Sequence, residues 1–321
     1  MSQKADNQFI KDAISKTPPL IQQIQKERGN TLVTFICDSP ITHTTAHRLN
    51  KVIRKMKIEN LDLFVHSSGG DLDSTAKIVK LLRENCKKYS VIVPFYAKSA
   101  ASLLAISADE LLMCKCGELG PLDPQVRDPI SGSWVPAHSI REALNFIEGV
   151  RDPLVKLSLT DRLPPLLMGT YREYQNASRQ YIEEAFAKID ESIRPKAIAT
   201  FIERYFSHGY PIDRNICKDV GLNVISLSES LENNICDLHE IYQDLIIEVR
   251  RRNMVHRLRR LRMSPDDETL SYYMEEGLFV VQADSRKIIT LNGQDITAEI
   301  DSEPSASQPS TSPNHPIAEK Q

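Results

Sequence analysis

The stretch LDLFVHSSGGDLDSTAKIVKLLREN, residues 61–85, decides the fold. Residues 61–67 are mostly apolar and predict a buried strand. Ser-Gly-Gly-Asp follows, which is the composition of a tight turn. Apolar residues then recur at positions 72, 76, 79 and 82, the spacing of one face of a helix. A strand, a turn and a helix in this order form the repeating unit of a parallel α/β sheet.

The same alternation continues on both sides of this stretch. Residues 31–37 (TLVTFIC), 89–97 (YSVIVPFYA) and 111–115 (LLMCK) predict further strands. Residues 42–57 and the segment KSAASLLAISADE (98–110) predict the helices between them. Helices dominate from residue 138 to about 245. Because strands alternate with crossover helices, the sequence predicts an α/β fold with a mainly parallel sheet and a helical C-terminal half.

Composition divides the chain into four predicted parts. Residues 1–30 are polar and predict a helical arm, and residues 31–245 form the main domain. Residues 246–300 predict an arginine-rich helix followed by a small hairpin. Residues 301–321 are rich in Ser and Pro and are predicted to be disordered. The arginines fit a solvated helix face or a contact between copies better than a nucleic-acid site, because no aromatic stacking pattern accompanies them.

Bulk properties exclude several classes of protein. The net charge of −3 gives no electrostatic reason to expect nucleic acid as a partner. Six cysteines do not form a disulfide framework, and Cys114 and Cys116 have no second pair at a zinc-site spacing. We therefore expect no metal and no cofactor. No apolar run approaches a membrane span and none resembles a signal peptide, so the predicted location is cytoplasmic.

Two predicted turns bear residues suited to catalysis. Gly69 and Gly70 follow one strand, and Ser99 and Ala100 follow the next, so both turns lie at the carboxyl edge of the sheet. Backbone N–H groups in such turns can stabilise an oxyanion. The residues alone leave alternatives open: a Gly-Gly turn serves many strand–helix connections, and Ser99 fits a helix N-cap as well as a nucleophile.

The motifs together resemble a known family. FVHSSGGDLDSTAKIVKLLR resembles the oxyanion turn and helix of the Clp protease proteolytic subunit and of signal peptide peptidase A, and YAKSAASLLAISADELLM resembles their nucleophile helix. VPFYAKSAAS, ADELLM and LGPLDPQ, in this order, are most similar to the peptidase family named for serine dehydrogenase proteinase. The resemblance covers roughly residues 30–240. It implies the ClpP/crotonase fold, a spiral of βαβ units.

The resemblance also implies roles for single residues. Aligning the Asp of the signal peptide peptidase pattern with Asp109 puts the nucleophile at Ser99, whereas the Clp pattern Ala-Ala-Ser points to Ser102 and shifts that register by three. Ser99 is therefore the predicted nucleophile and Ser102 a packing residue. The amides of Gly70 and Ala100, with Gly69 shaping the turn, would form the oxyanion hole.

A serine nucleophile also needs a general base. Relatives of signal peptide peptidase A use a downstream lysine, and Lys156 is the nearest match, although a solvated surface lysine explains it equally. Lys98 adjoins the nucleophile but should point to another face. No histidine stands at the Clp spacing, and His66 fits a packed strand residue as well. Asp123 could orient the base or belong to a turn.

These inferences predict a serine endopeptidase that cleaves polypeptides through Ser99 and Lys156 without a cofactor. Relatives of the fold assemble into rings or trimers, so the resemblance implies a homo-oligomer. Two alternatives are kept. One is a crotonase-type acyl-CoA hydrolase or isomerase, which uses the same paired amides. The other is a catalytically inactive scaffold, because Ala100 and Ala101 replace two glycines and the base lacks a motif.

Overall fold

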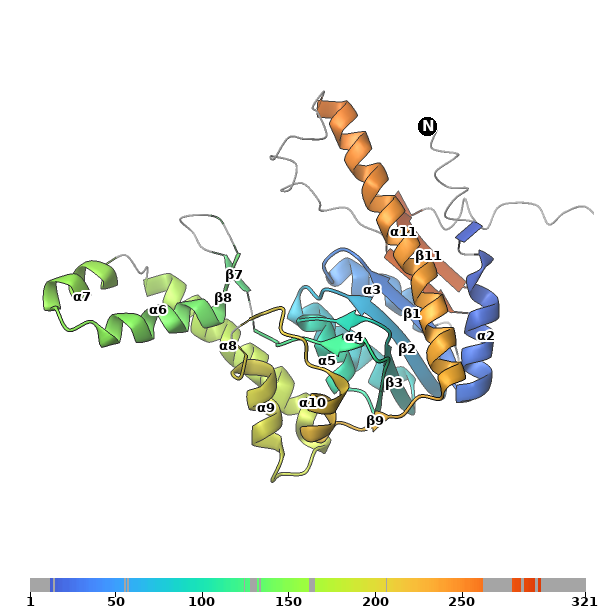
Figure 1. The fold of residues 1–321 in the computed structure, drawn as a ribbon, viewed down its shortest axis with the longest axis horizontal. Helices are drawn as coiled ribbons and strands as arrows, with labels where there is room; N and C mark the ends of the chain where they lie inside the picture. The colour runs from blue at the N-terminus through green and yellow to red at the C-terminus, as the bar shows by residue number, and fades with distance from the viewer. Residues whose placement is uncertain are drawn as a thin grey trace, which may run out of the picture.

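The computed structural model describes residues 12–13, 15–54, 56, 58–123, 125–127, 132, 134–161, 165–205, 207–261, 279–283, 286–291 and 294–295 (Figure 1). Its strands are β1 (Thr31–Cys37), β2 (Asn60–Ser67), β3 (Lys88–Val93), β4 (Tyr96–Ala97), β5 (Glu110–Met113), β6 (Glu118–Leu119), β7 (Gln125–Arg127), β8 (Trp134–Pro136), β9 (Val224–Ile225), β10 (Phe279–Ala283), β11 (Arg286–Leu291) and β12 (Gln294–Asp295). Its helices are α2 (Thr17–Arg28), α3 (His43–Ile53), α4 (Leu72–Asn85), α5 (Ala100–Ile106), α6 (Ala137–Gly149), α7 (Pro153–Thr160), α8 (Pro165–Ala185), α9 (Arg194–Ile202), α10 (Arg214–Asp219) and α11 (Glu229–Leu261), with a 3-10 turn η1 at Phe186–Lys188.

The main sheet is parallel through its centre, as the sequence predicts. Its strand order is β12-β11-β10-β1-β2-β3-β5-β9, and β1, β2, β3, β5 and β9 run parallel to one another. The short strand β4 pairs with the end of β2, where Ser67 faces Ala97. Each predicted strand from residue 31 to 115 is present within a few residues of its expected bounds. The predicted α/β class is confirmed.

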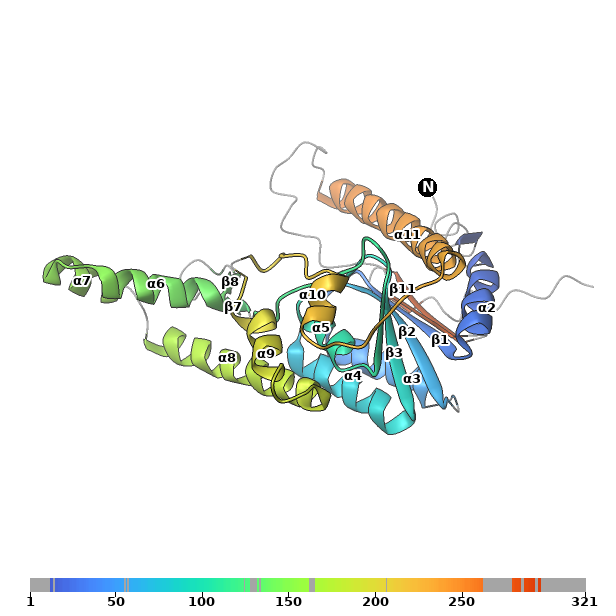
Figure 2. The ribbon, with the colours of Figure 1, turned by 60° about the horizontal axis from the view of Figure 1, so that its bottom comes forward.

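Helices cover both faces of the sheet (Figures 1 and 2). Successive strand residues point to opposite faces, so β1 directs Val33 and Phe35 into one core and Leu32 and Ile36 into the other. The first core lies against α3, α4, α5 and α9. The second lies beneath α2 and α11. Because both faces are buried, the strands are continuously apolar, which is why they were recognisable in the sequence.

A helical arm extends from this body. In both views α6, α7 and the start of α8 lie to one side, and α7 is at the far end (Figures 1 and 2). No residue of α7 is buried. Leu154 is 78% exposed and Leu157 is 59% exposed, although both are apolar. The predicted helical C-terminal half is confirmed, but part of it forms this arm instead of covering the sheet.

The C-terminal strands join the main sheet. The predicted hairpin is β10 and β11, and β10 pairs antiparallel with β1, with Thr34 opposite Gln282. The helix α11 continues through residue 246, because neither Gly nor Pro interrupts residues 229–261. The division predicted at residue 246 stays a prediction. The predicted arm over residues 1–30 is described only from residue 12, and the predicted tail at 301–321 lies outside the described residues.

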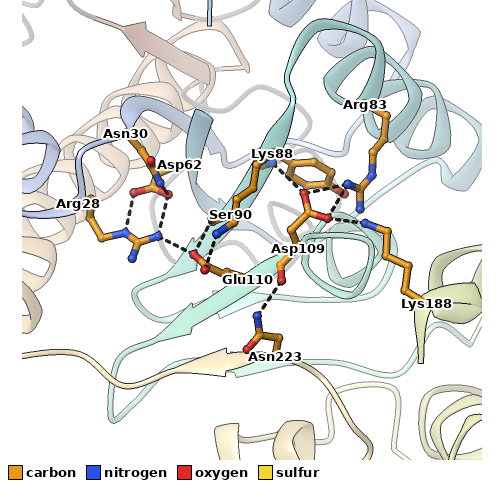
Figure 3. Close-up of polar contacts among 11 residues, drawn as sticks. Arg28, Asn30, Asp62, Arg83, Lys88, Ser90, Asp109, Glu110, Lys188 and Asn223 are labelled. Carbon is orange, nitrogen blue, oxygen red and sulfur yellow. Dashed lines mark hydrogen bonds and ion pairs between the residues drawn. The ribbon is translucent and has the colours of Figure 1, made fainter. Parts of the chain in front are cut away.

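An ionic network connects the amino-terminal ends of the parallel strands (Figure 3). The Asp109 carboxylate accepts two hydrogen bonds from Arg83 Nη1, at 2.8 and 2.9 Å, and one from the backbone of Tyr89; it also pairs with Lys188. Glu110 bonds Arg28 and Lys88, and Arg28 also bonds the buried Asp62. Asp109, which was used to align the sequence pattern with Ser99, and its neighbour Glu110 thus hold α2, α4, η1 and three strands in place.

We expect Asp109→Asn to lower the free energy of unfolding by about 2 kcal/mol at pH 7, since several charge-assisted hydrogen bonds are lost. Burial alone would raise the pKa of Asp109, but hydrogen bonds from Lys188 and Arg83 outweigh it and hold that pKa below its ordinary 3.8. The contribution is therefore present at neutral pH and disappears as the pH falls below about 4. Urea unfolding of both proteins at pH 7 and at acidic pH measures this. An equal difference at every pH would contradict the assignment.

Candidate active site

Two strand–helix turns meet at the carboxyl edge of the sheet. One connects β2 to α4 through Ser68, Gly69 and Gly70, and the other connects β4 to α5 through Lys98 and Ser99. A Cβ placed on Gly69 would lie 2.6 Å from the Lys98 carbonyl oxygen and 2.9 Å from the Ser99 Cβ. The two turns are therefore in direct contact, and only glycine fits at residue 69.

The Gly-Gly turn has its own backbone hydrogen bonds. The Ile41 N–H donates to the Gly69 carbonyl and the Asp71 N–H donates to the Ile41 carbonyl, both at 2.8 Å. The Gly69 N–H donates to Ser67 Oγ at 3.1 Å. Gly70 has a φ of +149°, and within the described part of the chain its N–H donates to no acceptor. The turn thus leaves one backbone donor available beside Ser99.

Ser99 has a strained backbone. Its φ is 50° and its ψ is −128°, and it is the only non-glycine residue with positive φ among those described. Its side chain makes no capping hydrogen bond to α5, so the N-cap alternative does not explain this serine. Among the described residues the Ala100 N–H also donates to no acceptor. Strain at a partly exposed serine is typical of functional sites.

Ser102 has a different environment. It is fully buried, its Oγ donates to the carbonyl of Ala97 or Gly120 at 2.7 and 2.9 Å, and the Gly120 N–H donates to it at 2.9 Å. Its hydroxyl is committed to holding the start of α5 against the loop after β6. Of the two serines, only Ser99 lies beside the Gly-Gly turn with a hydroxyl that bonds to no other residue in the described part of the chain.

Lys156 is not near this edge in a single chain. It lies on α7, at the far end of the arm, whereas α5 is in the body (Figure 1). Its Nζ donates to the carbonyl of Glu148 at 3.2 Å. The sequence could not reveal this, because the spacing between Ser99 and Lys156 does not show that a helical arm separates them. The predicted Ser99 and Lys156 pair is therefore not assembled within one chain.

His66 faces away from Ser99. It lies on the side of β2 that α11 covers, where its Nδ1 is 3.0 Å from His239 Nε2 and its Nε2 is 3.1 Å from Gln243 Nε2. Burial lowers the pKa of His66 to about 3 and that of His239 to about 4. Both rings are therefore neutral members of a packed cluster between β2 and α11, as the packing alternative for His66 expected.

A second histidine, His208, was missed by the sequence reasoning. It lies in the turn before Gly209 and Tyr210, whose carbonyls accept from Lys98 Nζ at 3.3 Å each. That segment also pairs with the end of β6, through two Leu119–Ile212 backbone bonds of 2.9 and 3.0 Å. His208 thus enters the neighbourhood of Ser99 from far along the chain. The only signal in the sequence is the histidine within YFSHGYPI, residues 205–212.

The environment of His208 suits proton transfer. Its Nδ1 is buried and has no hydrogen-bond partner, one of three such side-chain atoms in the described part. Burial lowers the pKa of His208; the Asp123 carboxylate acts in the opposite direction, and Lys98 lowers it further, so the pKa lies below its ordinary 6.5. Asp123 is itself 8% exposed. A lowered pKa favours the neutral ring, and the Asp123 carboxylate acts on it electrostatically; both are properties of a general base.

Nothing in the described residues points to a metal or a membrane span. Those residues contain no group of three or more His, Cys, Asp or Glu side chains that could hold a metal ion. None of the helices described has the combination of length and hydrophobicity that crossing a bilayer requires.

Comparisons with known proteins identify the class of protein. A model of the ClpP-like SDH-type serine proteinases matches residues 13–268. The chain belongs to this family, as its motifs predicted.

Two relatives are uncharacterized proteins of Methanocaldococcus jannaschii. One is 26% identical over 243 residues, which is 71% of this chain and 77% of the relative, and the other is 25% identical over 237 residues, or 70% and 77%. Solved structures with similarity include a mutant of the 1510-N membrane-bound stomatin-specific protease (TM-score 0.42, 15% identity, 63% of this chain and 82% of that chain). Another is ClpP1 from Listeria monocytogenes (TM-score 0.35, 14% identity, 62% and 94%).

Proposed function

We propose that this chain is a serine endopeptidase whose nucleophile is Ser99. The observation that carries the proposal is the contact between the Gly69–Gly70 turn and Ser99, with the Gly70 and Ala100 N–H groups donating to no acceptor among the described residues. Two backbone donors beside a hydroxyl match the requirements of acyl transfer, because the tetrahedral intermediate carries its negative charge on one oxygen. Membership of a serine proteinase family supports the same reaction.

The proposed mechanism has two stages. Ser99 Oγ attacks the carbonyl carbon of a peptide bond while His208 accepts the hydroxyl proton. The Gly70 and Ala100 N–H groups donate to the resulting oxyanion. The proton passes from His208 to the amine that leaves, and water then hydrolyses the acyl-serine with His208 again as base. Asp123, which acts on His208 electrostatically, would favour the imidazolium that forms in each stage.

His208 replaces Lys156 as the base we favour within one chain. Lys156 stays a prediction for an assembled protein, in which α7 of a second copy would have to reach Ser99. The expected homo-oligomer, the polypeptide substrate and the cytoplasmic location stay predictions as well.

Two substitutions separate the bases. We expect His208→Gln to lower kcat/KM for casein peptides by about 10³-fold, within the range that general base catalysis contributes. Lys156→Met should leave kcat/KM nearly unchanged. The parent protein should lose activity only below about pH 6.5, as a base of lowered pKa becomes protonated. A lysine base would move this loss to a higher pH. Full activity of His208→Gln, with loss in Lys156→Met, would show that Lys156 is the base.

Covalent labelling tests the reaction class. A fluorophosphonate should modify Ser99 in an active peptidase, and mass spectrometry of the digested protein identifies the labelled residue. An acyl-CoA enzyme using the same paired amides would stay unlabelled and turn over a thioester. If the chain neither reacts nor cleaves casein, the scaffold alternative is supported instead.

A further inference from the structure

Lys98, the residue before Ser99, makes four polar contacts through its Nζ. Its Nζ pairs with Glu118 Oε1 at 2.7 Å and lies 3.1 Å from the Leu119 carbonyl oxygen. It also lies 3.3 Å from the carbonyl oxygens of Gly209 and Tyr210. The side chain is only 15% exposed. The Nζ group is therefore held in place by four acceptors.

These contacts join three segments that are distant in sequence. Glu118 and Leu119 belong to β6, Lys98 directly precedes the nucleophile, and Gly209 follows His208. The Lys98 stem also packs on the loop after β6, where a Cβ on Gly120 would be 2.8 Å from Lys98 Cδ and 3.3 Å from the Ser99 N atom. A change in the Lys98 ammonium would therefore affect the turn that contains His208 and the backbone of Ser99 together.

We propose that Lys98 is a positioning residue that fixes the turn containing His208 beside Ser99. The proposal rests on the proposed function, in which His208 is the base. Its reason is geometric: the carbonyls of Gly209 and Tyr210 both point to Nζ, so a lysine at residue 98 sets where the preceding histidine lies. In this role Lys98 takes no part in the reaction itself and acts only by positioning His208.

The charge of Lys98 also affects the pKa of His208. Burial lowers the pKa of His208, Lys98 lowers it further, and Asp123 opposes both. These are the charged groups that act on the ring, and Glu118 compensates Lys98 itself. Removing the lysine charge should therefore raise the pKa of His208. The acid limb of the activity profile should then move to higher pH, an effect that a general loss of stability would not produce.

The test compares Lys98→Met with the parent full-length chain. We expect kcat/KM for casein peptides to fall about 10- to 100-fold, mainly through kcat, and the acid limb to move upward by a measurable fraction of a pH unit. Lys98→Arg keeps the charge and should leave the acid limb in place while the geometry is partly disturbed. Glu118→Gln keeps the lysine and its three carbonyl contacts and should reduce kcat/KM less than Lys98→Met. Lys80→Met, at an exposed position on α4, is the matched control.

An NMR titration of the histidine rings separates failure of this proposal from failure of the proposed function. The His208 signal is assigned by its loss in His208→Gln, and its midpoint should rise in Lys98→Met even if no substrate is ever cleaved. An unchanged midpoint, together with unchanged kcat/KM, would overturn the role of Lys98. A raised midpoint in a protein that hydrolyses no peptide would leave the positioning role intact and refute the peptidase.

Discussion

Replacing Ser99 with alanine is expected to lower kcat/KM for peptide hydrolysis by about 10⁴-fold or more, because covalent catalysis ends when the nucleophile is removed. Binding of a peptide should change little, since the Gly70 and Ala100 N–H groups remain. The folded state should also persist, because the Ser99 hydroxyl makes no capping bond in α5. Casein cleavage, fluorophosphonate labelling and thermal unfolding of the purified variant measure the three effects.

Two serine-to-alanine variants serve as controls. Ser158→Ala changes an exposed hydroxyl on α7 and should alter neither activity nor stability. Ser102→Ala should lower the free energy of unfolding by about 2 kcal/mol, since buried groups of Ala97 and Gly120 lose their partner, yet Ser99 should still react with the fluorophosphonate. If the label is lost in Ser102→Ala and kept in Ser99→Ala, the two assignments are reversed.

Gly70→Ala is expected to have a large effect on stability and on activity together. An alanine Cβ would lie 2.3 Å from the Ile41 N atom and 2.5 Å from its carbonyl oxygen, which are backbone atoms that cannot rotate away. The φ of +149° adds strain. We expect the free energy of unfolding to fall by about 3 kcal/mol or more. In the molecules that remain folded, kcat/KM should fall at least 10²-fold, because the Gly70 N–H is displaced from the oxyanion.

Two other glycines distinguish the causes. Gly29 has a φ of +71° but open space around its Cα, so Gly29→Ala should cost only the backbone strain, about 1 kcal/mol. Gly149 ends α6 with open space and no positive φ, so Gly149→Ala should be neutral or slightly stabilising. Urea unfolding of the three variants should rank them in this order. A Gly70→Ala protein as stable as Gly29→Ala would mean that the contact with Ile41 is not tight in solution.

The centre of the fold was readable from the sequence because both faces of its strands are buried. Continuous apolar runs bounded by Gly, Pro and Ser gave the strands, and their alternation with helices gave the parallel sheet. The choice of Ser99 over Ser102 followed from register with Asp109, whose own role is to bind Arg83 and Lys188 at the opposite edge. Local pattern was sufficient wherever the neighbours in space were also neighbours in sequence.

Contacts between distant segments were beyond such reasoning. His208 reaches the site only through the contacts of the 207–212 segment with β6 and Lys98, and no periodic pattern in the sequence predicts those contacts. For Lys156 the error was the reverse. Its spacing from Ser99 in the sequence suggested proximity, but Lys156 lies on α7, in the arm that extends from the body. The hairpin at 279–291 looked independent because its sequence does not reveal that β1 is its partner.

The positive φ of Ser99 affects which substitutions evolution would favour at this position. A φ of 50° is a conformation that glycine adopts at no steric cost, so serine there destabilises the fold by about 1–3 kcal/mol. Such strain is typical of residues that are kept for their function. A copy of the gene with no need for the Ser99 hydroxyl would gain stability by changing to glycine at residue 99, and a glycine there would indicate that the proposed nucleophile is no longer used.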